Sequence, residues 1–165
     1  MNVGLPSAPS AIGFVSMLAC DSLGWVGGYL LVNPQGRPLE FHCTVPVAPS
    51  RAQQILYGAT FDAFFFGELL TSALLKRGKT SPELVLTNHH GALAARELHQ
   101  GPMLYLPMID GPTDAPDATS LAAHRDYSED LHVGQKLLAR LPGSWPLTEP
   151  FERIEQAVRE AQRAA

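Results

Sequence analysis

Charged residues are scarce in this chain. Only 17% of its 165 residues are charged, below the ~25% usual in soluble proteins, while 45% are hydrophobic. A folded chain of this composition has a surface that is poor in charge. We therefore expect part of that surface to be covered by a protein partner or by a second copy of the chain.

Positive charge is in the minority. The chain has 12 Lys and Arg against 16 Asp and Glu, a formal net charge of -4. Proteins that bind nucleic acid usually neutralise phosphates with a clustered basic face. The net charge therefore does not support a free-standing nucleic-acid binder, although a local basic patch remains compatible with it.

Only two cysteines are present. Cys20 and Cys43 lie in apolar, strand-like runs, where a free cysteine behaves as a small hydrophobic residue. One disulfide between them is the alternative. We expect buried free thiols, as in a reducing compartment, and no zinc site, because neither cysteine has a CxxC partner.

Signals for secretion or membrane insertion are lacking. Residues 1–9 contain no Lys or Arg and include two prolines, so they do not resemble the charged start of a signal peptide. The hydrophobic runs are far shorter than the ~20 residues that span a bilayer. These absences predict a soluble, cytoplasmic protein without a membrane partner.

Three strands are expected near the start of the chain. An apolar run predicts the first at 12–20, and a second at 26–33 ends in the turn sequence Asn-Pro-Gln-Gly at 33–36. Residues 37–45 alternate between apolar and polar side chains, which predicts a half-exposed third strand. Prolines 46 and 49 then end an antiparallel meander.

Alternating helices and strands follow the meander. Ser50 and Thr60 are suitable N-cap residues, and Gly58 and Gly78 are suitable helix ends. The expected elements are a helix at 51–57, a helix at 61–77, a strand at 83–87, a helix at 90–98 and a strand at 102–106. A strand, helix and strand at this spacing predict a parallel crossover unit.

The remaining chain predicts a loop and two helices. Residues 107–119 are too rich in proline for a regular element, and helices are expected within 128–163. The expected fold is one α/β domain over residues 1–165 with its core at 12–106. Its mixed sheet has a three-strand antiparallel meander followed by helix, strand, helix and strand, with two C-terminal helices.

This order of elements resembles the ribonuclease H-like superfamily over about residues 12–106. The segment 84–91, Leu-Val-Leu-Thr-Asn-His-His-Gly, is also similar to the strand end of endonuclease V enzymes. In those enzymes an aspartate stands at the position of Asn88, and a His-Gly pair follows. The spacings from Asp21 to Glu68 and from Glu68 to Asn88 are similar as well.

The resemblance implies a metal-dependent site. In that superfamily, carboxylates at one end of the sheet hold divalent ions that neutralise charge during phosphodiester hydrolysis. The implied catalytic residues are Asp21, Glu68, Asn88 and His90, with Asp21 and Glu68 as ligands of Mg²⁺ or Mn²⁺. Asn88 departs from the family pattern, because its neutral amide is a weaker ligand than a carboxylate. This departure favours a degenerate site.

Each of these residues also has a structural explanation. Asp21 is typical of a turn between strands. Glu68 lies in the most apolar helix, where a carboxylate must be exposed, paired or functional. His90 and its neighbour His89 also suit the polar start of a helix, and His42 suits cross-strand packing.

Three further polar residues precede or begin a late helix. His124, Asp126 and Asp130 fall where many ribonuclease H-like enzymes carry a final acid or histidine. Acids at the start of a helix are also explained by the helix dipole alone. The sequence leaves both explanations open.

Three functions are compatible with these patterns. The favoured hypothesis is a non-catalytic or degenerate ribonuclease H-like subunit that acts through protein contacts, with no cofactor. Its aromatic residues Trp25, Tyr57 and Trp145 are suitable interface anchors. The alternative is a Mg²⁺- or Mn²⁺-dependent phosphodiesterase that uses Asp21 and Glu68. A small ligand-binding or dimerisation module is the third.

Overall fold

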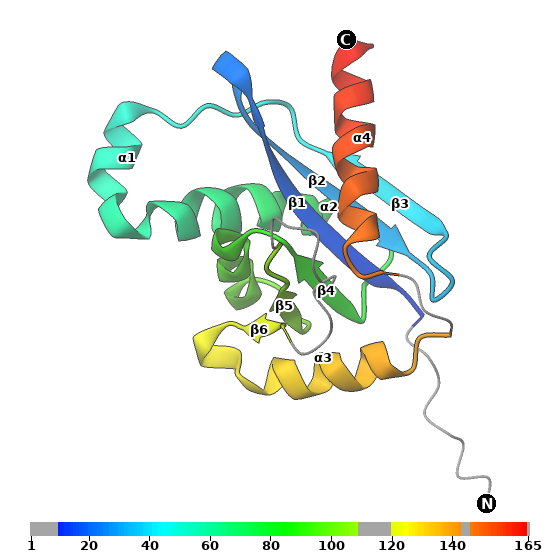
Figure 1. The fold of residues 1–165 in the computed structure, drawn as a ribbon. Coiled ribbons are helices and arrows are strands. Elements are labelled where there is room, and N and C mark those ends of the chain that lie inside the picture. Colours follow the sequence, from blue (N-terminus) through cyan, green and yellow to red (C-terminus); the bar gives the residue numbers. More distant parts are fainter. Residues whose placement is uncertain (1–9, 109–119, 143–145, 165) are drawn as a thin grey trace, which may run out of the picture.

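A computed structural model describes residues 10–108, 120–142 and 146–164 of the chain (Figure 1). Most of the predicted loop at 107–119 lies outside the described residues, as does Trp145. The described part consists of one six-stranded mixed sheet with helices on both faces.

The sheet begins with an antiparallel meander. Strands β1 (Ile12–Cys20), β2 (Gly24–Val32) and β3 (Pro38–Cys43) pair in sequence order, as predicted. On the other side of β1, strands β4 (Leu84–Thr87) and β5 (Met103–Tyr105) run parallel to it. A short strand β6 (Ala122–Ala123), which the sequence did not predict, is antiparallel to β5. The order across the sheet is β3-β2-β1-β4-β5-β6.

The helical segments follow the predicted order but differ in type. Three are regular α-helices where predicted, and the segment predicted as one helix at 61–77 is a π-helix followed by an α-helix. The segment predicted at 90–98 is a 3₁₀ helix. The helical segments are α1 (Arg51–Tyr57), η2 (Gly58–Thr60), η3 (Ala63–Thr71), α2 (Ser72–Arg77), η4 (His90–Glu97), η5 (Arg125–Tyr127), α3 (Glu129–Ala139) and α4 (Glu149–Arg163).

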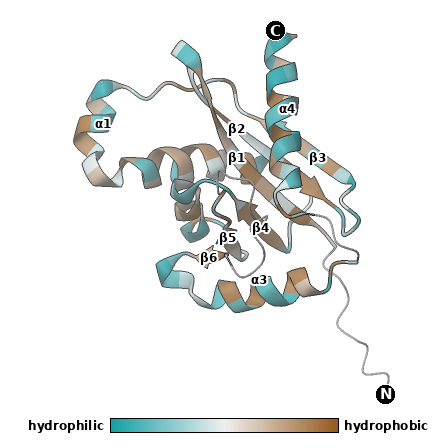
Figure 2. Cartoon of the chain, viewed as in Figure 1, coloured by the Kyte–Doolittle hydropathy of each residue, from teal (hydrophilic) through white to brown (hydrophobic). Residues whose placement is uncertain are grey.

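Hydrophobic side chains pack on both faces of the sheet. Ile12 and Phe14 of β1 face the side covered by α3 and α4, where Phe151 packs edge-on against Phe14. Val15 faces the other side, together with Leu74 of α2. The sheet therefore lies between two layers of helices, and its strands are mostly apolar (Figure 2). These features confirm the predicted mixed α/β fold class.

The two tight turns of the meander show how the local sequence sets the chain direction. In the predicted turn at 33–36, Asn33 Oδ1 accepts hydrogen bonds from the amides of Gln35 and Arg37, and Gly36 has a φ of 80°. Between β1 and β2, Asp21 has a φ of 36°, a conformation that Asp tolerates better than most residues. Asp21 begins the 3₁₀ turn η1 (Asp21–Leu23).

Helix α1 lies away from the sheet and from α3 and α4 (Figure 1). None of its seven residues is buried, and Ile55 and Leu56 are 65% and 83% exposed. Its start is fixed by a capping box, in which Ser50 and Gln53 each accept a hydrogen bond from the other's amide. At its end, the ring of Tyr57 stacks on Phe64 at 4.0 Å.

Both cysteines are free thiols, as predicted, but they are half-buried at the edge of the core. Trp25, expected at an interface, is also half-buried and packs edge-on against Phe66 at 4.9 Å.

In the described ranges, no single helix has the length and hydrophobicity to cross a membrane, and one bent pair, Arg51–Thr60 with Ala63–Arg77 at 105°, meets the criteria of length and composition.

Candidate functional site

The register of the sheet places Asp21 well beyond the end of β4. Val15 of β1 pairs with Thr87, so Asn88 is level with Ser16. A strand rises about 3.3 Å per residue, which puts Asp21 roughly 16 Å farther along β1 than Ser16. The residue beside Asn88 on the neighbouring strand is therefore a serine.

Asp21 and Asn88 line the same open hollow of 480 Å³. Its floor is the second half of β1, and its wall is the face of α4 that carries Glu155 and Arg159. These two side chains form an exposed ion pair one helical turn apart. The hollow is polar and holds both positive and negative charge.

Glu68 and His90 border a different hollow, with a volume of 690 Å³. It lies between the segment from Tyr57 to Glu68, the helix η4, and residues 123–125 at the end of β6. Glu68 is exposed, which agrees with one of the three explanations left open by the sequence. Glu68 and His90 thus line one hollow, and Asp21 and Asn88 line another. That all four residues act at one site stays a prediction.

A compact group of metal-ligating side chains lies at the rim of the larger hollow. Glu97 at the end of η4, His124 after β6 and Asp126 in η5 each offer one ligand atom, and these atoms lie within 4.8 Å of one another. Two carboxylates and an imidazole suit a divalent ion. We call these three residues the rim cluster.

The ring of His124 is held in one orientation. Its Nδ1 accepts a hydrogen bond from the Asp126 amide at 3.2 Å, and its Nε2 lies 3.7 Å from Glu97 Oε1. His124 thereby acts as the N-cap of η5. The structure thus places His124 and Asp126 at the start of η5, and the same residues also form part of the rim cluster.

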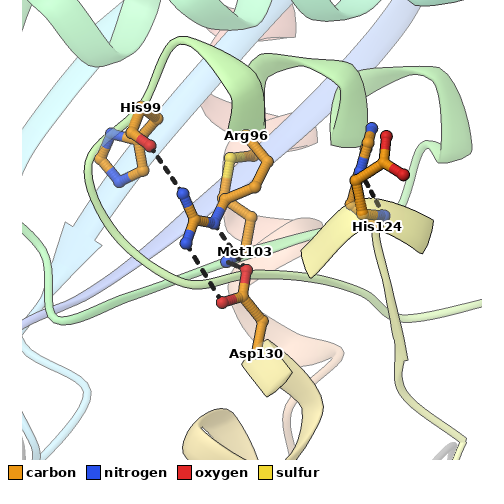
Figure 3. Close-up of polar contacts among 6 residues, drawn as sticks. Arg96, His99, Met103, His124 and Asp130 are labelled. Carbon is orange, nitrogen blue, oxygen red and sulfur yellow. Dashed lines mark hydrogen bonds and ion pairs between the residues drawn. The ribbon is translucent and has the colours of Figure 1, made fainter. Parts of the chain in front are cut away.

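Asp130 has a structural role. Its buried carboxylate accepts hydrogen bonds from Arg96 Nε at 2.6 Å, from Arg96 Nη2 at 3.3 Å and from the Met103 amide at 3.2 Å (Figure 3). The Arg96 guanidinium also donates to the His99 carbonyl and lies over the ring of Tyr127 at 4.0 Å. This group joins η4, β5 and α3, and it fixes the elements that carry the rim cluster.

His89 faces the core, unlike its neighbour His90. Its ring packs on Phe66 at 4.0 Å, and its Nδ1 is buried without a hydrogen-bond partner among the residues that the structure describes. Burial lowers the pKa of His89, an effect that nearby Asp62 partly opposes and His90 adds to. A neutral, packed ring fits the structural explanation of this residue.

The sequence did not reveal Glu97 as a candidate. It lies within a predicted helix of mixed composition, and its partners His124 and Asp126 lie 27 and 29 positions later. An isolated acid at a helix end carries no spacing signal of its own. Only the packing of η5 against η4 brings the three side chains together.

Comparison with known proteins gives little similarity. No protein-family model matches the chain, and no curated protein matches it. Two solved structures of endonuclease V from Ciona intestinalis, in complex with DNA containing an inosine followed by a ribo-adenosine, are similar at 13% sequence identity. Their TM-scores are 0.37 and 0.36, and the matches cover 86% and 82% of this chain. The chain spans about three-fifths of the length of those proteins, with coverages of 61% and 58%. A likeness at this level establishes neither a family nor a function.

Proposed function

We propose that the chain is a ribonuclease H-like subunit with a degenerate site, and that it acts through protein contacts made by α1. The observation that carries this proposal is the exposure of Ile55 and Leu56 on a helix with no buried residue. Burying such a side chain is worth about 1.5–3 kcal/mol. A partner that covers both would gain a substantial part of its binding energy there.

The way in which both ends of α1 are held supports the same proposal. A seven-residue helix is too short to persist alone in water, where ~12–15 residues are marginal. Yet α1 is held at its start by the Ser50 capping box and at its end by Tyr57. The fold thus presents two large aliphatic side chains in a defined orientation, which lowers the entropy lost on binding.

The meander and its parallel neighbours support the ribonuclease H-like assignment. Three antiparallel strands with β4 and β5 on the other side of β1 form the order that the sequence resemblance implies. Extending the pairing of Val15 with Thr87 by one residue puts Ser16 level with Asn88 at the end of β4, and neither side chain is an acid. A serine and an amide support a degenerate rather than an active metal site.

The partner is first expected to be a second copy of the chain, since most soluble oligomers are homo-oligomers. Sedimentation velocity at increasing concentration should show self-association of the wild-type chain. Leu56→Asp should shift it to monomer. Val133→Asp, a change at a 42% exposed position on α3, is the matched control and should leave association unchanged.

A protein of another kind is the alternative partner. Affinity capture from the native source tests this alternative. A partner that binds through α1 should be captured by the wild-type chain and not by Leu56→Asp. A wild-type chain that is monomeric at every concentration, together with identical captured proteins for both chains, would contradict the proposal.

A metal-dependent phosphodiesterase is the second candidate. It is supported by Glu68 and His90 lining a hollow that also contains Glu97 and His124. Incubation of single- and double-stranded DNA and RNA with the chain and Mg²⁺ or Mn²⁺ tests it. Cleavage that is lost in both Asp21→Ala and Glu68→Gln would favour the predicted pair, whereas intact substrates under all conditions would exclude the activity.

A further inference from the structure

We propose that the rim cluster of Glu97, His124 and Asp126 binds a divalent transition-metal ion whose open coordination positions face the 690 Å³ hollow. The ligand atoms lie within 4.8 Å of one another. Ligands of Zn²⁺ lie about 2.0–2.2 Å from the ion, so atoms in one coordination shell are roughly 3–4 Å apart. Small rotations of two exposed carboxylates would therefore complete the shell.

The hollow is a second observation, independent of the cluster. Its volume of 690 Å³ is within the range of about 300–1,000 Å³ typical of ligand pockets. Glu97 and His124 form part of its wall. Three protein ligands leave positions for water or substrate, as in catalytic rather than structural zinc sites.

The charge of the hollow also favours a cation. Asp62, Glu68 and Glu97 line it, and Arg125 is the one Lys or Arg among its described lining residues. Arg125 Nε lies 3.8 Å from Asp126 Oδ2, but both side chains are largely exposed. Such a surface pair is weak, so an ion can replace Arg125 as the partner of Asp126.

The backbone around the cluster is held in place. Glu97 directly follows Arg96, whose guanidinium is bound to the buried Asp130 at the start of α3. Asp126 directly precedes Tyr127, whose ring lies against that same guanidinium. The elements that carry all three ligands are thus fixed relative to one another before an ion binds.

Binding at His124 requires a change of tautomer. Because Nδ1 accepts the Asp126 amide hydrogen, the neutral ring carries its proton on Nε2, which is directed at Glu97. An ion at Nε2 displaces that proton, and Nδ1 takes up a proton in its place. The Asp126 amide then loses its acceptor.

The ligand set indicates the kind of ion. Imidazole suits Zn²⁺ and other transition metals, and carboxylates suit Mn²⁺ and Mg²⁺. We therefore expect Mn²⁺ and Zn²⁺ to bind more tightly than Mg²⁺, which prefers oxygen ligands and retains its water.

Titration of the full chain with MnCl₂, followed by electron paramagnetic resonance of the free ion, tests the site. One site per chain is expected, with at least a tenfold loss of affinity in Asp126→Asn and in Glu97→Gln. Glu129→Gln removes the same charge from an exposed position nearby and should change the affinity less than twofold. Circular dichroism establishes that each variant is folded.

Histidine nitrogen spectra with ZnCl₂ provide a second readout. Addition of Zn²⁺ should convert His124 Nδ1 from an acceptor to a protonated nitrogen. The absence of a stoichiometric site, or several weak sites that Glu129→Gln reduces as much as Asp126→Asn, would overturn the proposal. It does not rest on contacts made by α1, so either proposal can fail alone.

Discussion

Arg96 and Asp130 form a two-pronged ion pair that joins η4 to the start of α3. Arg96 Nε lies 2.6 Å from one carboxylate oxygen, and Nη2 lies 3.3 Å from the other. The side chains are only 15% and 3% exposed. The same carboxylate accepts the Met103 amide, so one acid satisfies donors from two other elements.

Removal of one partner should be strongly destabilising. Asp130→Ala leaves the Arg96 guanidinium buried without its counter-charge, and such a loss typically costs 3–5 kcal/mol, about the value we expect in urea unfolding. Glu129→Ala, at the exposed neighbouring position, should cost less than about 0.5 kcal/mol. Equal effects of the two substitutions would show that the ion pair is unimportant for stability.

Glu40 should make stability depend on acid pH. Burial raises the pKa of this carboxyl, but hydrogen bonds from the Lys79 and Thr80 amides and from His42 outweigh that effect and lower it. The unfolded chain then binds a proton more readily than the folded one. Stability is therefore full above the unfolded pKa of about 4.3 and is lost as pH falls through the folded pKa.

Glu40→Gln should reduce this dependence and lower the free energy of unfolding at pH 7 by about 1 kcal/mol. Denaturant unfolding between pH 3 and pH 7 measures both the pH dependence and the free energy of unfolding at pH 7. Glu152→Gln on the exposed surface of α4 is the control, and a matching pH profile for the two variants would argue against a role for Glu40.

His89 should make the free energy of unfolding depend on pH near neutrality as well. Because its pKa is lowered in the fold, the unfolded chain takes up a proton first as pH falls below about 6.5. The free energy of unfolding should therefore decrease as pH falls from the pKa of the unfolded chain to the lower pKa of the folded chain. His89→Phe keeps a ring against Phe66 and should flatten the decline, whereas His132→Gln on the exposed side of α3 should not. Part of the decline should remain, because burial also lowers the pKa of His99.

Gly67 should not tolerate a larger residue. A Cβ there would lie 2.6 Å from Ala94 Cβ and 2.8 Å from the Gly91 carbonyl oxygen, which is closer than side-chain atoms approach. Gly67→Ala should push η3 away from η4 and cost about 1–3 kcal/mol in thermal or urea unfolding. At Gly78 the nearest atoms to an added Cβ are 3.4 Å away, so Gly78→Ala should be far milder.

Local sequence accounts for most of the sheet. The apolar run at 12–20 matches β1 residue for residue, and Asn33 forms the predicted turn through its side chain. The predicted pairing of His42 across the strands is also observed, since it lies opposite Tyr29 with the two rings stacked. Each of these features depends on residues close together in the chain or on alternation along one strand.

The arrangement of the site depends on interactions that local sequence does not encode. Which residue of β1 is level with Asn88 is set by the parallel pairing of β1 with β4, two strands separated by more than sixty residues. That pairing places Ser16 there instead of Asp21. Glu97 likewise meets His124 only because η5 folds back onto η4.

Helix α1 joins the rest of the protein mainly through its two ends. The capping box and the stack of Tyr57 on Phe64 hold those ends, while Ile55 and Leu56 between them contribute nothing to the core. Substitutions along the outer face of α1 are thus largely free of selection for folding. The contact surface that we propose on α1 can therefore change its specificity over evolution while the sheet stays the same.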